Sequence, residues 1–81
     1  MSEASPRLRW QCRRGMRELD ELLQSFLECG YAQLDDAQRL TFERLLTTQD
    51  NQLLEYFMGR SVPRDSDTAD VVAKIRHAAH P

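Results

Sequence analysis

The residues best able to do chemistry lie in one short stretch, residues 10–20, which reads Trp-Gln-Cys-Arg-Arg-Gly-Met-Arg-Glu-Leu-Asp. It contains the only tryptophan of the chain and three arginines placed around one glycine, Gly15. Guanidinium groups pair with carboxylates and phosphates, and a glycine lets another protein backbone come close. This combination suits the recognition of a partner better than it suits catalysis.

The same arginines also have a simpler explanation. Glu18 follows Arg14 by four residues, and Glu21 follows Arg17 by four. On a helix such pairs contribute about 0.2–0.5 kcal/mol each. A solvated helix end with two ordinary ion pairs is therefore the alternative to a binding surface. The glycine between the arginines favours the binding surface.

Two hypotheses apply to Cys12. It lies beside Arg13 and Arg14, and nearby positive charge lowers the pKa of a thiol, so an activated thiolate is one of them. The favoured one is a small, half-buried residue on the same helix face as Trp10. Cys12 and Cys29 show no metal-ligand spacing, and two cysteines are too few for the framework of a small secreted domain. We expect both to be reduced thiols.

The other candidates for catalysis or metal binding have simpler explanations. His77 and His80 are three residues apart near the end of the chain, without a further ligand at a suitable spacing. Two pairs of carboxylates stand where helices should begin and be capped by negative charge, Asp35 with Asp36 and Asp65 with Asp67. The sequence has no GxGxxG, GxxxxGK[ST] or Ser/His/Asp pattern. We expect no enzymatic activity, no metal site and no tightly held cofactor.

Size and charge narrow the possibilities further. The chain has 81 residues and a formal net charge of -2, with a pI near 5.6. A chain this short buries only about 60% of its unfolded surface, so its core is small and we expect no deep active site. We expect a single helical domain, 1–81, that is ordered over about 6–79. The acidic balance argues against a nucleic-acid partner. The arginines nevertheless gather near the N-terminus, where they predict a cationic face: Arg7, Arg9, Arg13, Arg14 and Arg17.

The sequence also predicts where the protein resides. No apolar run approaches the roughly 20 residues that a membrane-spanning helix needs. The first residues, Met-Ser-Glu-Ala-Ser-Pro, lack the basic start and apolar centre of a secretory signal. We expect a cytoplasmic protein without membrane insertion.

The apolar residues recur at spacings of three and four, and no segment alternates as a strand would. We predict an all-α fold, a small bundle of five short helices at about residues 6–14, 16–29, 35–47, 50–58 and 66–79. The predicted core consists of Leu19, Leu22, Phe26, Phe42, Leu45, Leu53, Phe57 and Ile75. Further packing is expected from Leu40, Leu46, Met58, Val71, Val72 and Ala79, whereas His80 and Pro81 should fray.

Proline and glycine mark several of the expected helix ends. Pro6 is suited to the first turn of the first helix. Gly15 can adopt a left-handed conformation and form a joint between the first two helices, and Gly59 can end the fourth helix in the same way.

Polar residues mark the expected helix starts. Asp35 should be the N-cap of the third helix, with Gln38 three residues later completing a capping box. Asp50 is predicted to be the N-cap of the fourth helix. Ser66 or Asp67 is predicted to cap the fifth.

The run Arg14-Gly15-Met16-Arg17-Glu18-Leu19-Asp20 contains an Arg-Gly-x-x-Glu motif. It resembles the motif of the small bacterial flavinylation factors of succinate dehydrogenase, the SdhE or YgfY-like family, which has mitochondrial relatives. Further segments look like the family at similar spacings: Trp10-x-Cys12-Arg13 before the motif, and Phe42-x-Arg44-Leu45-Leu46 and Asp50-x-x-Leu53 after it. The resemblance covers about residues 7–75.

The resemblance implies a monomeric five-helix domain that is cytoplasmic in bacteria. It implies that this domain binds the flavoprotein subunit of succinate dehydrogenase or fumarate reductase and promotes the covalent attachment of FAD to it. In such flavoproteins the flavin is joined to a histidine of the partner, largely within the partner's own site. FAD is then the cofactor of the partner and not of this chain.

The resemblance also identifies the residues of a partner-binding surface. They are Arg14, Gly15 and Glu18, with Arg13, Arg17 and Asp20 beside them, and Trp10 and Asp50, which match further positions of the family pattern. The sequence departs from the family at Tyr56, where Trp is commoner, and in its short C-terminal tail.

Two other functions are compatible with a small helical bundle. Some members of the family have been described as antitoxin-like partners of a small membrane toxin, and short helices can resemble a helix-turn-helix DNA reader. The acidic pI opposes DNA binding. An antitoxin-like or other small module that binds a protein remains the alternative to a flavinylation factor.

Overall fold

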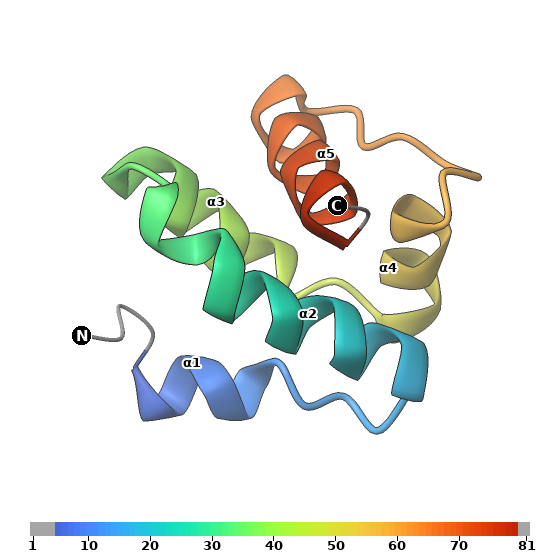
Figure 1. Ribbon diagram of the computed structural model, residues 1–81. Helices are drawn as coiled ribbons and strands as arrows, with labels where there is room; N and C mark the ends of the chain where they lie inside the picture. The colour runs from blue at the N-terminus through green and yellow to red at the C-terminus, as the bar shows by residue number, and fades with distance from the viewer. Residues whose placement is uncertain (1–4, 80–81) are drawn as a thin grey trace.

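The computed structural model describes residues 5–79, which form five α-helices and one short 3-10 helix (Figure 1). The helices are α1 Pro6–Gln11, α2 Arg17–Cys29, α3 Asp36–Leu45, α4 Asp50–Phe57 and α5 Ser66–Ala79, and the 3-10 helix η1 is Tyr31–Gln33. No strand occurs within residues 5–79, so the predicted all-α fold is confirmed. The expected fraying of His80 and Pro81 concerns residues outside the described part.

Helix α1 begins as predicted but ends earlier than residue 14. The Leu8 amide donates to Ser5 Oγ at 3.1 Å, and Pro6 occupies the first turn. The helix ends at Gln11 because the Arg14 amide turns away and donates to an Asp20 carboxylate oxygen at 2.6 Å. Gly15, with a φ of 83°, then forms the predicted left-handed joint to α2.

Helix α2 presents one apolar face to the core, and Gly30 is its C-cap. Gly30 has a φ of −124°, so it does not need the freedom of a left-handed glycine. A Cβ atom at Gly30 would instead lie 2.6 Å from Cε1 of Phe26, which is buried. Beyond Gly30, the 3-10 helix buries Tyr31, and Leu34 is buried just after it. Neither was predicted as core, because three residues are too few to show a helical period.

Helix α3 has the predicted capping box. The Gln38 amide donates to Asp35 Oδ1 at 2.8 Å, and the Asp35 amide donates to Gln38 Oε1 at 3.0 Å. The expected packing of Leu40 is wrong, because its side chain is 64% exposed. Two residues along a helix correspond to a rotation of about 200°, so Leu40 points away from the buried Phe42.

Two of the predicted caps are wrong by one residue. The N-cap of α4 is Gln49, and Asp50 is the first residue of the helix, with its carboxylate bound to Arg14 instead. At the start of α5, Asp65 accepts hydrogen bonds from the Thr68 amide at 3.0 Å and the Thr68 hydroxyl at 2.8 Å. These bonds lower the pKa of Asp65. The cap is therefore Asp65, and neither Ser66 nor Asp67.

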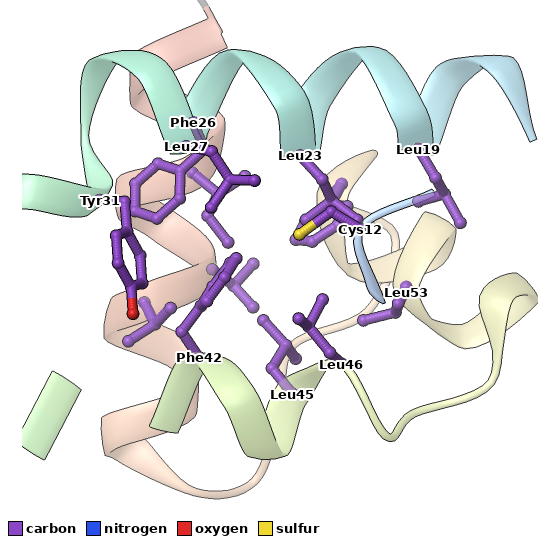
Figure 2. Close-up of a cluster of buried hydrophobic side chains, with 14 of the residues drawn as sticks. Cys12, Leu19, Leu23, Phe26, Leu27, Tyr31, Phe42, Leu45, Leu46 and Leu53 are labelled. Atoms are coloured by element: carbon purple, nitrogen blue, oxygen red, sulfur yellow. The ribbon is translucent and has the colours of Figure 1, made fainter. Parts of the chain in front are cut away.

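Helix α5 lies against α2, α3 and α4, and α1 runs beneath α2 (Figure 1). Phe42 is at the centre of the core, with its ring centroid 5.4 Å from that of Phe26 and 5.6 Å from that of Tyr31 (Figure 2). All predicted core residues are buried except Leu22, which packs at the edge. Of the residues expected to add packing, Leu46, Val71 and Val72 are buried, Leu40 and Met58 are exposed, and the Ala79 side chain lies outside the described part.

The Phe26 ring occupies the space that a side chain at Gly30 would need. Gly30→Ala forces the buried Phe26 ring to move, and overfilling of this kind costs about 1–3 kcal/mol of unfolding free energy. We expect a lower denaturation midpoint in urea, followed by far-UV circular dichroism. Gln33→Ala, an exposed change in the following turn, should leave the midpoint unchanged. Equal midpoints for Gly30→Ala and the wild type would show that the ring yields without cost.

Candidate functional site

The candidate site is built around the loop of residues 12–16, which joins α1 to α2. A Cβ atom at Gly15 would meet no other atom within 4 Å, so this glycine faces open space. Its positive φ is the only obstacle to a side chain there. Gly15 therefore offers an uncovered stretch of backbone to any molecule that approaches the loop.

Arg14 lies at the centre of a polar network, and its side chain points into the protein. Its Nε donates to Asp50 Oδ1 at 2.7 Å. Nη1 donates to the carbonyl oxygens of Gln11 at 3.1 Å and Leu46 at 2.8 Å, and Nη2 donates to that of Thr48 at 3.0 Å. One side chain thus connects the end of α1 to the α3–α4 turn and the first residue of α4.

The two carboxylates of this network serve the same loop. Asp20, in the first turn of α2, accepts the Arg14 amide, while Asp50 accepts the Arg14 guanidinium. The Arg14 side chain is 17% exposed and that of Asp50 is 34% exposed. A hydrogen bond to a charged group contributes about 1.5–3 kcal/mol in proteins, with the lower end suited to such partly exposed partners. We call Arg14, Asp20 and Asp50 the clasp.

The other residues identified from the sequence point outward. Trp10 is 75% exposed, and Arg13, Gly15, Arg17 and Glu18 are exposed as well. All five lie in the last turn of α1, the loop and the first turn of α2. We call these five residues the recognition face.

The ordinary ion pairs suggested as an alternative are formed only in part. Arg17 Nε lies 3.2 Å from Glu21 Oε1, and both side chains are exposed, so this pair contributes less than about 1 kcal/mol. Arg14 pairs with Asp50 and not with Glu18, because the chain leaves the helix between them. Glu18 makes no ion pair within residues 5–79.

Cys12 contradicts both hypotheses made for it. Its side chain is fully buried and points into the core between α2 and the end of α3 (Figure 2). Leu8, one helical turn earlier, is buried on the same side, whereas Trp10 lies about 200° around the helix axis. Burial raises the pKa of the Cys12 thiol to about 11, although Arg14 and Arg9 act in the opposite direction. Cys12 is a core residue and not an activated nucleophile.

The remaining candidate residues form no further site in the part of the chain that is described. Residues 5–79 contain no group of three or more His, Cys, Asp or Glu side chains placed to hold a metal ion. His80, the partner suggested for His77, lies outside those residues. None of the helices between residues 5 and 79 is long and apolar enough to cross a membrane.

The acceptors that hold Arg14 could not be predicted from the sequence. Two of them are the backbone carbonyls of Leu46 and Thr48, which lie 32 and 34 residues away in the chain. A carbonyl group is present in every residue, so no residue type could have revealed them. Asp50 was included through the family resemblance alone, and its contact with Arg14 is a finding of the structure.

This chain is similar to one family model and to several known proteins. Residues 6–79 match a family model described as "Flavinator of succinate dehydrogenase". The chain is 44% identical to the FAD assembly factor SdhE of Shewanella oneidensis over 75 residues, covering 93% of this chain and 92% of the relative. It is 46% identical to that of Colwellia psychrerythraea over 69 residues, covering 85% and 76%. For Methylococcus capsulatus the identity is 43% over 70 residues, covering 86% and 84%.

The difference between the two thiols can be measured directly. Cys29 is exposed and Cys12 is buried, and only the thiolate reacts. We expect a disulfide reagent at neutral pH to modify Cys29 rapidly and Cys12 only after unfolding, since a thiol with a pKa of about 11 is almost fully protonated there. Cys29→Ser should remove the fast phase. Two fast-reacting thiols in the native wild type would contradict the burial of Cys12.

Proposed function

Since the chain belongs to the family of flavinators of succinate dehydrogenase, we propose that it binds the flavoprotein subunit of succinate dehydrogenase or fumarate reductase. In that complex it promotes the covalent attachment of FAD to the partner. The observation that carries this proposal is the recognition face. It presents Gly15 and Glu18 of the family motif to solvent, on a loop that polar contacts hold in place.

The recognition face has the properties of a protein-binding surface. Trp and Arg are among the residue types that most often dominate the energy of protein interfaces. Trp10 and Arg13 are exposed on the α1 side of Gly15, and Arg17 and Glu18 on the α2 side. The bare backbone of Gly15 between them allows a partner surface to come close to the loop.

The proposed action is to align the partner's own reacting groups. Within residues 5–79, the buried Cys12 thiol has a raised pKa, and no group of side chains is placed to hold a metal ion. A bound helper can still accelerate a reaction by holding the flavin and the acceptor in the reactive geometry. We therefore propose an assembly factor that is not an enzyme.

An open groove of about 630 Å³ lies between the end of α2 and α5, lined by residues such as Phe26, Leu34, Lys74 and His77. It lies apart from the recognition face and contains no glycine-rich loop of the kind that cradles a dinucleotide phosphate. We propose that the isolated protein holds no FAD tightly and that FAD belongs to the partner.

A protein partner fits the charges better than nucleic acid does. Of the N-terminal arginines, Arg14 is turned inward and Arg17 is paired with Glu21. The cationic face expected from the sequence is thus reduced, and Glu18 lies within it. A nucleic-acid surface needs unpaired cations along the phosphates. We propose that the protein acts as a cytoplasmic monomer in one helical domain and does not bind nucleic acid.

Gly15 provides the first test of the recognition face. Gly15→Gln adds a long uncharged side chain at a position open to solvent, so the main cost to folding is backbone strain of about 1–3 kcal/mol. The added side chain separates the partner surfaces, and we expect covalent FAD on the partner to fall at least tenfold. The readout is flavin fluorescence of the denatured flavoprotein subunit.

Gly59 supplies a control matched in backbone conformation. Its φ of 78° resembles the 83° of Gly15, but it lies at the end of α4. The three atoms nearest to a Cβ atom at Gly59 belong to the flexible end of Arg76, so Gly59→Gln should lose comparable stability while retaining flavinylation. If both variants flavinylate the partner equally well, the recognition face is wrongly placed.

Glu18 provides the second test. Glu18→Gln removes a charge and little volume from an exposed side chain that makes no ion pair within residues 5–79, so the helical circular dichroism signal should be unchanged. We expect slower flavinylation and weaker binding to the flavoprotein subunit, because a partner cation loses its counter-charge. Glu28→Gln is the matched control, at the other end of α2 and roughly 15 Å away along the helix. Wild-type flavinylation by Glu18→Gln would exclude a role for this carboxylate.

A further inference from the structure

We propose that Arg14, the first residue of the Arg-Gly-x-x-Glu motif, does not contact the partner but positions the loop that does, together with Asp20 and Asp50. This inference rests on the proposed function, and it divides the motif into two roles. The clasp fixes the loop from inside, and the recognition face meets the partner from outside. Arg14, Asp20 and Asp50 are thus positioning residues.

The donors of Arg14 are almost all used within the protein. A guanidinium group has five N–H bonds. Four hydrogen bonds leave this group, to Asp50 and to the carbonyls of Gln11, Leu46 and Thr48. With its side chain 17% exposed, Arg14 has no pair of free N–H groups to offer to a carboxylate or phosphate of another molecule. A bidentate contact of Arg14 with the partner would require breaking hydrogen bonds of the clasp.

The clasp fixes the loop at the residue before Gly15 from two sides. The backbone amide of Arg14 is bound to Asp20 on α2, at 2.6 Å. The side chain of Arg14 is bound to the α3–α4 turn and the start of α4. Gly15 follows directly, in the left-handed conformation. The position of the bare Gly15 backbone relative to Glu18 on α2 is therefore set by these contacts.

A loop that is already in its bound conformation loses less entropy when a partner binds. Ordering a loop costs binding free energy, and rigidity in the bound conformation removes that cost. Loss of the clasp should accordingly weaken binding to the flavoprotein subunit without changing the complex once it is formed. Direct contact by Arg14 would have a different consequence, since the complex itself would then be altered.

The test uses Arg14→Lys, Asp50→Asn and the double variant in the full chain. Lysine keeps the charge but cannot make several hydrogen bonds in fixed directions. Each single change should raise the Kd for the purified FAD-free flavoprotein subunit by about tenfold or more. The double variant should bind no more weakly than the weaker single variant. At saturating concentrations of the factor, the flavinylation rate should return to that of the wild type.

Two further measurements separate positioning from general damage. Amide hydrogen exchange of residues 13–16 should accelerate in both single variants, because the loop opens more often. Gly30→Ala loses stability in the core with the loop contacts intact, so it should bind the partner as the wild type does. If Arg14→Lys does not fold, Asp20→Asn with Asp50→Asn provides the same comparison.

Several outcomes would overturn the proposal. Wild-type affinity in both single variants would show that the clasp does not prepare the loop. Effects on Kd that add in the double variant, or a weakened Arg14→Lys whose loop exchanges like the wild type, would show direct contact by Arg14. A wild-type chain that does not bind the flavoprotein subunit would instead overturn the proposed function, whereas the exchange measurement still decides whether the clasp orders the loop.

Discussion

The candidate site depends on one partly buried set of contacts, the hydrogen bonds of the Arg14 guanidinium. This group satisfies carbonyl oxygens at the end of α1 and in the α3–α4 turn, and it neutralises Asp50 at the start of α4. Helix ends leave carbonyl groups without partners, and a cation is favourable beside them. Arginine is suited to this place because its donors point in several fixed directions, so one side chain can join segments that are far apart in the sequence.

The clasp and the apolar core stabilise different parts of the protein. The core draws on all five helices, with Phe42 between Phe26 and Tyr31 and with α5 packed against three other helices. The loop of residues 12–16 contributes only Cys12 and part of Met16 to that core. The outward residues of this loop are therefore available for binding, because they contribute little to the packing of the core. Polar contacts supply the order that apolar packing does not give the loop.

Under the proposed function, this division suits a protein that aligns the reacting groups of its partner. Rate enhancement through alignment requires a rigid surface, since a flexible one would lose entropy on binding and would hold the partner loosely. A loop supports such a surface only if contacts on the side that faces the protein hold its backbone in place. The clasp lies behind the exposed Gly15 and Glu18 and fulfils that requirement.

The sequence by itself determined the helices and most of the core, and it singled out residues 10–20 as the candidate site. These follow from local patterns, namely apolar spacing in α2 to α5, the capping box at Asp35 and Gln38, and the glycines at positions 15 and 59. Tertiary structure alone decided that Arg14 faces inward and Cys12 is buried, that Asp50 binds Arg14 instead of capping α4, and that Leu40 is exposed. Each of these depends on contacts between segments about thirty or more residues apart, or on which side of a helix meets its neighbours. Local patterns carry no information about such contacts, because the acceptors of Arg14 include backbone carbonyls that every residue possesses.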